Sequence, residues 1–144
     1  MSLSLAEISD RIEIQDLLVE YCYAIDSRAW DALDDVFTPD ATIDYTEMGG
    51  TRGSLVETKA FLSSAMANFA GFQHMISTSK VTVDGDTATG RTMCHNPMIT
   101  ADDKGARHVF LCGFWYRDLF VRTANGWRIQ ERHEERSYYP TRLG

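Results

Sequence analysis

Residues 109–116 read Val109-Phe110-Leu111-Cys112-Gly113-Phe114-Trp115-Tyr116 and show no alternation of apolar and polar side chains. A short apolar run of this kind is typical of a β-strand that is buried on both faces. Helices can cover one face of such a strand. We expect a second copy of the chain to cover the other, which predicts a dimer or trimer formed through the outer sheet face. The residues after Tyr139 are an alternative cover, although few remain.

Segments on either side of this run have the composition of further strands. Four segments are rich in β-branched and aromatic residues: 74–83, 87–100, 107–122 and 127–139. Short turn signals rich in Asp, Asn and Gly separate them, at 84–86, 102–105 and 124–126. Consecutive hairpins follow from this arrangement, so we expect an antiparallel sheet.

The N-terminal half of the chain has helical patterns. A capping box, Ser4-x-x-Glu7, precedes apolar residues at helical spacing, which predicts a helix from about Leu5 to Ile25. A second short helix is expected before Pro39, a short strand at 41–45, and a third helix from the capping box at Ser54 to about residue 69. Helices followed by strands predict an α+β fold, with the N-terminal helices packed on a curved sheet.

Length and composition favour one globular domain spanning residues 1–144. The chain is 44% hydrophobic and carries a net charge of −7, with a pI of about 5.0. This acidic balance disfavours nucleic acid and anionic membranes as partners. The three cysteines lack metal-site spacing and the N-terminus lacks a signal-peptide pattern, so reduced thiols and a cytoplasmic location are expected.

Two titratable residues have unusual neighbours. Asp26 follows Ala24 and Ile25 at the end of the first predicted helix, where an acid is disfavoured unless it has a partner. Capping of the next helix is the structural alternative for Asp26. His74 stands in apolar company at the start of the first long strand, where a hydrogen-bonded core histidine is the alternative to a catalytic base.

Metal chemistry is a weaker interpretation of the histidines. His133-Glu134-Glu135 lacks the second histidine of the zinc-protease helix motif and lies on a predicted strand. His95 and His108 are expected near strand edges. We therefore predict neither a metal nor a cofactor.

Three short motifs occur in a fixed order: Tyr21-x-x-x-x-Asp26-x-x-x-Trp30-Asp31, Ile43-Asp44-Tyr45 and Phe72-Gln73-His74-Met75. Together they resemble the SnoaL-like, nuclear-transport-factor-2-like superfamily, which includes scytalone dehydratase, bile acid 7-alpha-dehydratase and hexachlorocyclohexane dehydrochlorinase. The resemblance spans nearly the whole chain. It implies a cone-shaped α+β barrel and an enzymatic pocket.

The resemblance also implies roles for individual residues. In these relatives an aspartate at the position of Asp26 pairs with a histidine at the position of His74, and that histidine takes the substrate proton. Tyr45 matches a pocket tyrosine of both dehydratases, and Tyr21 matches a further tyrosine of the bile acid enzyme. Arg136 falls where that enzyme has a functional arginine.

Other positions depart from the relatives. Met98 and Cys112 stand where scytalone dehydratase has a second histidine and an asparagine, and we expect both to contact the substrate, together with Trp30 of the first motif. The lysine of the dehydrochlorinase aligns near Tyr21. Strict alternation along the strand places Arg136 on the sheet face opposite to that of Trp127. Arg136 therefore reaches the pocket only through a bulge or at the strand's end.

Three functions are compatible with these residues. The first is a cofactor-independent lyase that acts on a small apolar cyclic hydroxy-carbonyl compound by His74-mediated proton abstraction and elimination of water. The second is an isomerase or cyclase that uses the same base. The third is a non-catalytic binding or assembly subunit, like the small subunit of ring-hydroxylating dioxygenases. Convergence of His74 and Asp26 within hydrogen-bond distance favours an enzyme.

Overall fold

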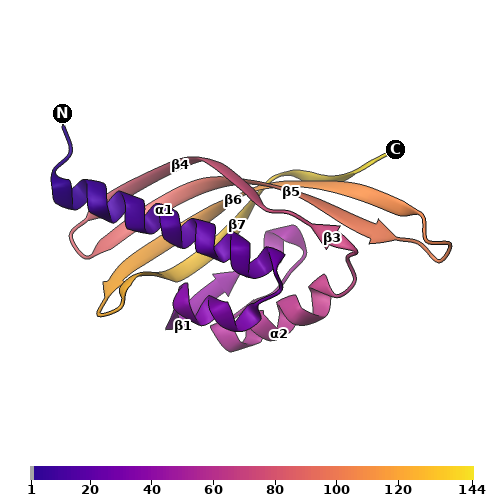
Figure 1. Cartoon of the computed structure of the whole chain (residues 1–144), viewed down its shortest axis with the longest axis horizontal. Helices are drawn as coiled ribbons and strands as arrows, with labels where there is room; N and C mark the ends of the chain where they lie inside the picture. The colour runs from indigo at the N-terminus through magenta and orange to yellow at the C-terminus, as the bar shows by residue number, and fades with distance from the viewer. Residues whose placement is uncertain (1) are drawn as a thin grey trace.

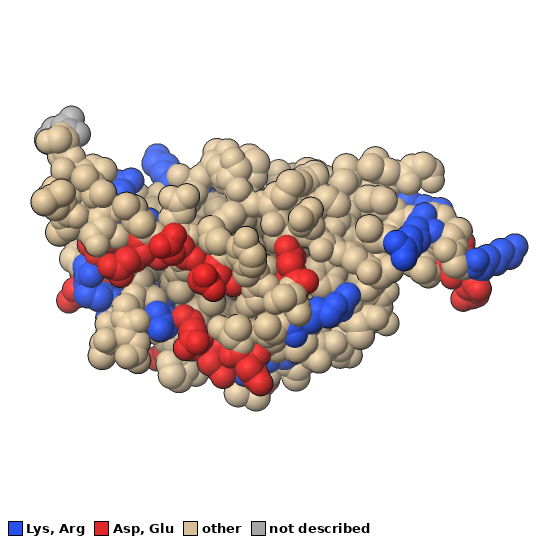
Figure 2. Space-filling view, viewed as in Figure 1, with Lys and Arg blue, Asp and Glu red and all other residues tan. Residues whose placement is uncertain are grey.

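The computed structural model describes residues 2–144 and begins with helix α1, Leu5–Asp26. Its capping box forms as predicted: Glu7 N–H donates to Ser4 Oγ at 3.1 Å, and Ser4 N–H donates to the Glu7 carboxylate at 2.9 Å. The buried face of α1 packs against the sheet through Ile14, Leu18 and Ile25. The opposite face carries exposed acidic side chains, and Figure 2 shows them gathered along this helix.

The segment after α1 differs from its prediction. Trp30–Asp35 forms a short 3-10 helix, η1, and strand β1 already starts at Phe37 and continues to Asp44. Pro39 therefore lies inside a strand and does not end a helix. It is tolerated there because the register of β1 is irregular between Phe37 and Thr42, so no ladder hydrogen bond needs its missing N–H.

The remaining predicted elements occur in the predicted order, together with a 3-10 turn and two two-residue strands that were not predicted. A 3-10 turn η2 (Thr46–Met48) and the short strand β2 (Arg52–Gly53) lead to helix α2 (Leu55–Met66), whose capping box at Ser54 is formed. The strands that follow are β3 (Gly71–Phe72), β4 (Met75–Asp84), β5 (Thr87–Ala101), β6 (Arg107–Thr123) and β7 (Gly126–Leu143).

The sheet has the strand order β2-β1-β7-β6-β5-β3, and β4 also pairs with β5. Strands β4 to β7 form the consecutive antiparallel hairpins expected from the turn signals. Strand β1 differs, because it runs parallel to β7 and makes the sheet mixed. Turn signals between sequence neighbours predict nothing about this pair, since 81 residues separate the end of β1 from the start of β7.

The sheet curls around the helices as a half-barrel. Figure 1 shows α1 lying across one face of the long strands, with α2 beside the end of α1. The core fills the space between them and includes Tyr21, Phe37, Phe120, Trp127 and Ile129. This is the predicted α+β architecture, with the helices on one side of the curved sheet. Among residues 2–144 no helix is long and apolar enough to cross a membrane.

The outer sheet face is partly covered by the chain's own side chains. The ring of Tyr138 lies over Gly113, where an added Cβ would come within 2.0 Å of it. The guanidinium of Arg91 stacks 3.9 Å from the ring centroid of Trp115. Met93, the cross-strand partner of Trp115, still exposes 38% of its surface. Self-association through this face stays a prediction.

Candidate active site

Asp26 and His74 form a hydrogen-bonded pair at the junction of α1 and the sheet. His74 Nδ1 lies 2.7 Å from Asp26 Oδ1, and the backbone N–H of His74 donates to Asp26 Oδ2 at 3.0 Å. The His74 side chain is 4% exposed and that of Asp26 is 26% exposed. Asp26 does not cap the next helix, because η1 has Ala29 at its N-cap and no side-chain cap. The Asp26 carboxylate instead accepts hydrogen bonds from His74.

The turn that follows Asp26 is tied to the end of α2. Arg28 donates to the carbonyls of Met66 and Phe69 at 2.6 and 3.0 Å, and its guanidinium lies 4.6 Å from the ring centroid of Phe72. These contacts stabilise the left-handed backbone of Arg28, whose φ is 58°. They also fix the segment just before His74 against the end of α1.

The second ring nitrogen of His74 faces Asn96. The Asn96 amide Nδ2 lies 3.2 Å from His74 Nε2. A carboxylate beside Nδ1 favours the tautomer with the proton on Nδ1, which leaves the Nε2 lone pair as the acceptor from Asn96. Asn96 is 3% exposed, so the base end of His74 lies in a largely water-free environment.

A cavity of about 340 Å³ opens in front of this pair. Helices α1 and α2 and the inner face of β5 to β7 form its wall, together with the turn after β1. Most of its lining is apolar, and its polar groups are few: Tyr21, Tyr45, Asn68, His74, Asn96 and Glu134. A small apolar cavity with a few convergent polar groups is typical of a small-molecule site.

Two tyrosines from different elements meet in this cavity. Tyr21 on α1 and Tyr45 at the end of β1 share a hydrogen bond of 2.5 Å between their hydroxyls. Tyr45 is positioned by a tight turn, in which Gly50 N–H donates to the Tyr45 carbonyl at 2.9 Å and a Cβ on Gly50 would lie 2.7 Å from Tyr45 Cβ. Burial raises the pKa of both tyrosines above their usual value, so both are neutral hydrogen-bond donors.

A buried ion pair lies behind Tyr21. Arg132 and Asp118 are both fully buried and form two hydrogen bonds of 2.7 and 2.8 Å. The Arg132 guanidinium stacks 4.2 Å from the Tyr21 ring centroid and 3.8 Å from that of Tyr116. These contacts hold the ring of Tyr21 in place.

Five of the predicted site residues line the cavity, namely Tyr21, Tyr45, His74, Met98 and Cys112. Asp26 acts behind His74. Two residues predicted to contact the substrate lie outside this lining: Trp30 packs against the core, and Arg136 is not among the lining residues. The bulge that Arg136 needed does exist, between Ile129 and Glu131, but its guanidinium donates to the carbonyl of Glu47 at 2.9 Å and stacks on Tyr139. Arg136 therefore holds the η2 turn at the cavity rim.

Asn96 and Glu134 are polar cavity residues on the sheet that sequence reasoning missed. Asn96 lies between Cys94 and Met98 on the inner face of β5. A polar residue between two apolar inward residues is the sequence signal that marks it. Glu134 is inward only because the β7 bulge reverses the alternation after Ile129. Residues 131–136 are all charged or histidine, so neither alternation of this segment looks more buried than the other.

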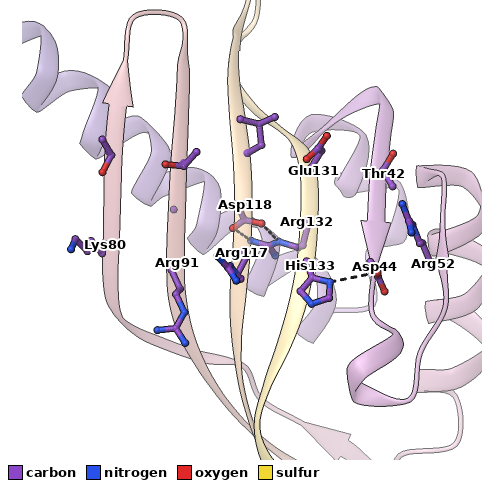
Figure 3. A pocket seen from close by; sticks show the side chains of 14 residues that line it. Thr42, Asp44, Arg52, Lys80, Arg91, Arg117, Asp118, Glu131, Arg132 and His133 are labelled. Carbon is purple, nitrogen blue, oxygen red and sulfur yellow. Dashed lines mark hydrogen bonds and ion pairs between the residues drawn. The ribbon is translucent and has the colours of Figure 1, made fainter.

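A larger hollow of about 790 Å³ lies on the opposite face of the sheet. Figure 3 shows it across the long strands with α1 behind them, and charged side chains such as Lys80, Arg91 and His133 line it. It contains none of the predicted site residues. Within residues 2–144 no group of three or more His, Cys, Asp or Glu side chains is arranged to hold a metal ion.

Known proteins share the sequence family and the fold of this chain. The sequence model of the SnoaL-like domain matches residues 6–133. The chain belongs to the SnoaL-like domain family. An uncharacterized protein of Mycobacterium tuberculosis strain H37Rv is 52% identical over 136 residues, which cover 94% of this chain and 91% of that protein.

Two solved structures share the fold of this chain. A Kribbella flavida protein aligns with a TM-score of 0.84 and 28% identity, covering 94% of this chain and 95% of its own. A hexachlorocyclohexane dehydrochlorinase of Novosphingobium barchaimii aligns with a TM-score of 0.78 and 18% identity, covering 97% and 94% of the two chains. The latter identity shows a shared fold alone. The half-barrel also shares its fold with a nuclear transport factor 2-like superfamily protein of Salmonella enterica, with a TM-score of 0.78 and 16% identity over 92% and 94% of the two chains.

Proposed function

We propose that this SnoaL-like protein is a cofactor-independent lyase that abstracts a proton from carbon next to a carbonyl group in a small apolar cyclic substrate. The observation that carries the proposal is the His74–Asp26 pair in the lining of an apolar cavity, where the second ring nitrogen of His74 is partnered by Asn96 alone. A carboxylate on Nδ1 fixes the tautomer and stabilises the imidazolium that forms when Nε2 takes a proton.

The tyrosine pair supplies stabilisation for the negative charge that follows proton abstraction. Two hydroxyls that share one hydrogen bond hold two protons, and only one is used between Tyr21 and Tyr45. The other proton is available to a substrate oxygen. A neutral donor in a water-poor cavity stabilises a developing enolate more strongly than the same donor does in water.

The apolar lining sets the kind of substrate. Ile25, Phe61, Leu62, Met98 and Phe114 line the cavity, and its volume fits one small cyclic molecule. A hydrogen-bonded base and a hydroxyl pair in one cavity favour an enzyme over a non-catalytic binding subunit, which has no need for them. Isomerisation begins with the same abstraction and is the alternative outcome of the reaction.

The proposal is tested by measuring loss of water from a panel of cyclic β-hydroxy ketones and hydroxysteroid-like enones, through the new C=C bond of the product. Wild type should turn over at least one compound. His74→Ala should lose about a hundredfold or more in kcat, the contribution typical of a positioned base. The matched control is His108→Ala, because His108 lies outside the cavity lining and is partnered by Asp102 and Arg142. Equal rates for His74→Ala and wild type would refute the proposal.

A further inference from the structure

The carboxyl group of Glu134 lines the cavity and has no hydrogen-bond or ion-pair partner among residues 2–144. It lies on β7, is 8% exposed and lines the same cavity as His74. No hydrogen bond or ion pair within the described chain involves its side chain, whereas the other inward charges of β7 are partnered, as in the Arg132–Asp118 pair. A buried polar group is normally hydrogen-bonded, so an unpartnered one that faces a cavity points to a ligand.

The neighbours of Glu134 leave it protonated near neutral pH. Burial is the largest effect, and together with the charge of Asp44 on β1 it raises the pKa of Glu134 to about 8. Arg132 on the same strand opposes the rise, but Asp118 already neutralises this arginine. The other titratable groups around the carboxyl are uncharged because burial also raises their pKa values: Tyr21, Tyr45, Tyr116, Cys94 and Cys112.

The sheet places Glu134 and the base on different sides of the cavity. Strand β6 lies between β7, which carries Glu134, and β5, which carries Asn96 next to His74. Cys112 and Phe114 of β6 line the cavity between them. A cavity of about 340 Å³ holds one small ligand, so a ligand lying over β6 contacts both His74 and the carboxyl of Glu134.

We propose that Glu134 is the general acid of this cavity and delivers its proton to an oxygen of the substrate while His74 takes a proton from carbon. The inference rests on the proposed function and deepens it, because it separates the acid from the base. Two distinct groups favour elimination, since an isomerase can return the abstracted proton with the same base.

The step balances as a dehydration. The substrate C–H replaces Asn96 as the partner of His74 Nε2, which takes the proton, and the C–H electron pair forms the new C=C bond. The C–O bond of the neighbouring carbon breaks, its electron pair stays on oxygen, and the Glu134 proton converts the departing hydroxide to water. The imidazolium of His74 then loses its proton to solvent and the carboxylate of Glu134 regains one.

This assignment also defines the substrate class. A protonated carboxyl group donates a hydrogen bond to a neutral hydroxyl or carbonyl oxygen. An anionic substrate carboxylate would lose its hydration in a mostly apolar cavity whose described lining contains neither Lys nor Arg to pair with it. We therefore expect neutral hydroxy ketones to be substrates and the corresponding hydroxy acids to be poor ones.

Kinetics of Glu134→Gln test the role, with Glu131→Gln as the matched control because Glu131 is exposed on the same strand. Glutamine keeps the size and can donate a hydrogen bond, but it cannot transfer a proton. We expect kcat to fall by about 10²–10⁴-fold, the range of a positioned acid. Wild-type kcat should decline as the pH rises through about 8, and this decline should be absent in Glu134→Gln. Glu131→Gln should keep both the rate and the decline.

A second measurement needs no substrate. Carbon NMR of protein labelled at the glutamate carboxyl carbons should show one resonance that titrates near pH 8 and is missing in Glu134→Gln. Titration of that resonance near pH 4.5 would overturn the assignment. So would a wild-type rate and pH profile in Glu134→Gln when His74→Ala is inactive, and in that case the His74 mechanism stands. Full activity of His74→Ala would instead remove the proposed function and this inference together.

Discussion

Replacing Asp26 with asparagine tests the geometry of the pair most closely, because the change is nearly isosteric. The Asp26 carboxylate accepts from both the backbone N–H and Nδ1–H of His74, at 3.0 and 2.7 Å. An asparagine offers one acceptor oxygen and one NH₂ group. If its oxygen keeps the backbone N–H, its NH₂ group faces Nδ1. Nδ1 must then become an acceptor, and the ring proton moves to Nε2, where the base is needed.

The magnitudes follow from these contacts. Loss of the base lone pair should lower kcat by about 10²–10⁴-fold. Exchange of hydrogen bonds to a charged carboxylate for neutral ones should lower the free energy of unfolding by about 1–2 kcal/mol. Most of the molecules therefore stay folded, since domains of this kind are stabilised by about 5–15 kcal/mol.

Three measurements check this prediction: steady-state kinetics, urea unfolding, and nitrogen NMR of the imidazole ring, which distinguishes the two tautomers. The control is Asp16→Asn, an exposed acid on the same helix, which should leave all three unchanged. The reasoning is refuted if Asp26→Asn keeps a rate within a few-fold of wild type, or if it loses activity while Nε2 still carries no proton.

Further predictions concern stability, the cavity rim and assembly. The pKa of Glu134 is raised from 4.5 to about 8 in the folded state, so the free energy of unfolding should decrease as the pH rises through this range. At 1.36 kcal/mol per pKa unit the decrease is up to about 5 kcal/mol. Urea titrations of Glu134→Gln should lack this decrease. Arg136→Ala removes the hydrogen bond to the Glu47 carbonyl and should raise KM about 2- to 10-fold, with a smaller effect on kcat in steady-state assays. If the outer sheet face is an interface, sedimentation should show a dimer or trimer that Met93→Glu dissociates; a monomeric wild type would exclude this.

The local elements were predictable because their signals are local. Both capping boxes, at Ser4 and Ser54, form in the structure, and the turn signals after 84 and 124 mark the hairpins. Long-range pairing was not predictable in the same way. The parallel contact of β1 with β7 pairs the first strand of the chain with the last. The short helix at Trp30 is a 3-10 helix that ends at Asp35, because β1 starts before Pro39.

The site divides along the same line. The His74–Asp26 pair was predictable from the family resemblance, since the apolar neighbours alone left a structural alternative open for each residue. The inward position of Glu134 was not, because it depends on one extra residue in β7 at the bulge. The same bulge turns Arg136 inward, but its guanidinium donates a hydrogen bond to the carbonyl of Glu47 and does not line the cavity.

The central claim is that His74 is the base, and chemical rescue tests it most directly. His74→Ala leaves a space the size of an imidazole ring beside Asp26. The rate at which the ketone substrate takes up deuterium from D₂O, at the carbon next to its carbonyl, reports proton abstraction alone. We predict that this uptake is lost in His74→Ala, increases with added imidazole, and is unchanged in His108→Ala. Uptake by His74→Ala at the wild-type rate without imidazole would contradict the claim.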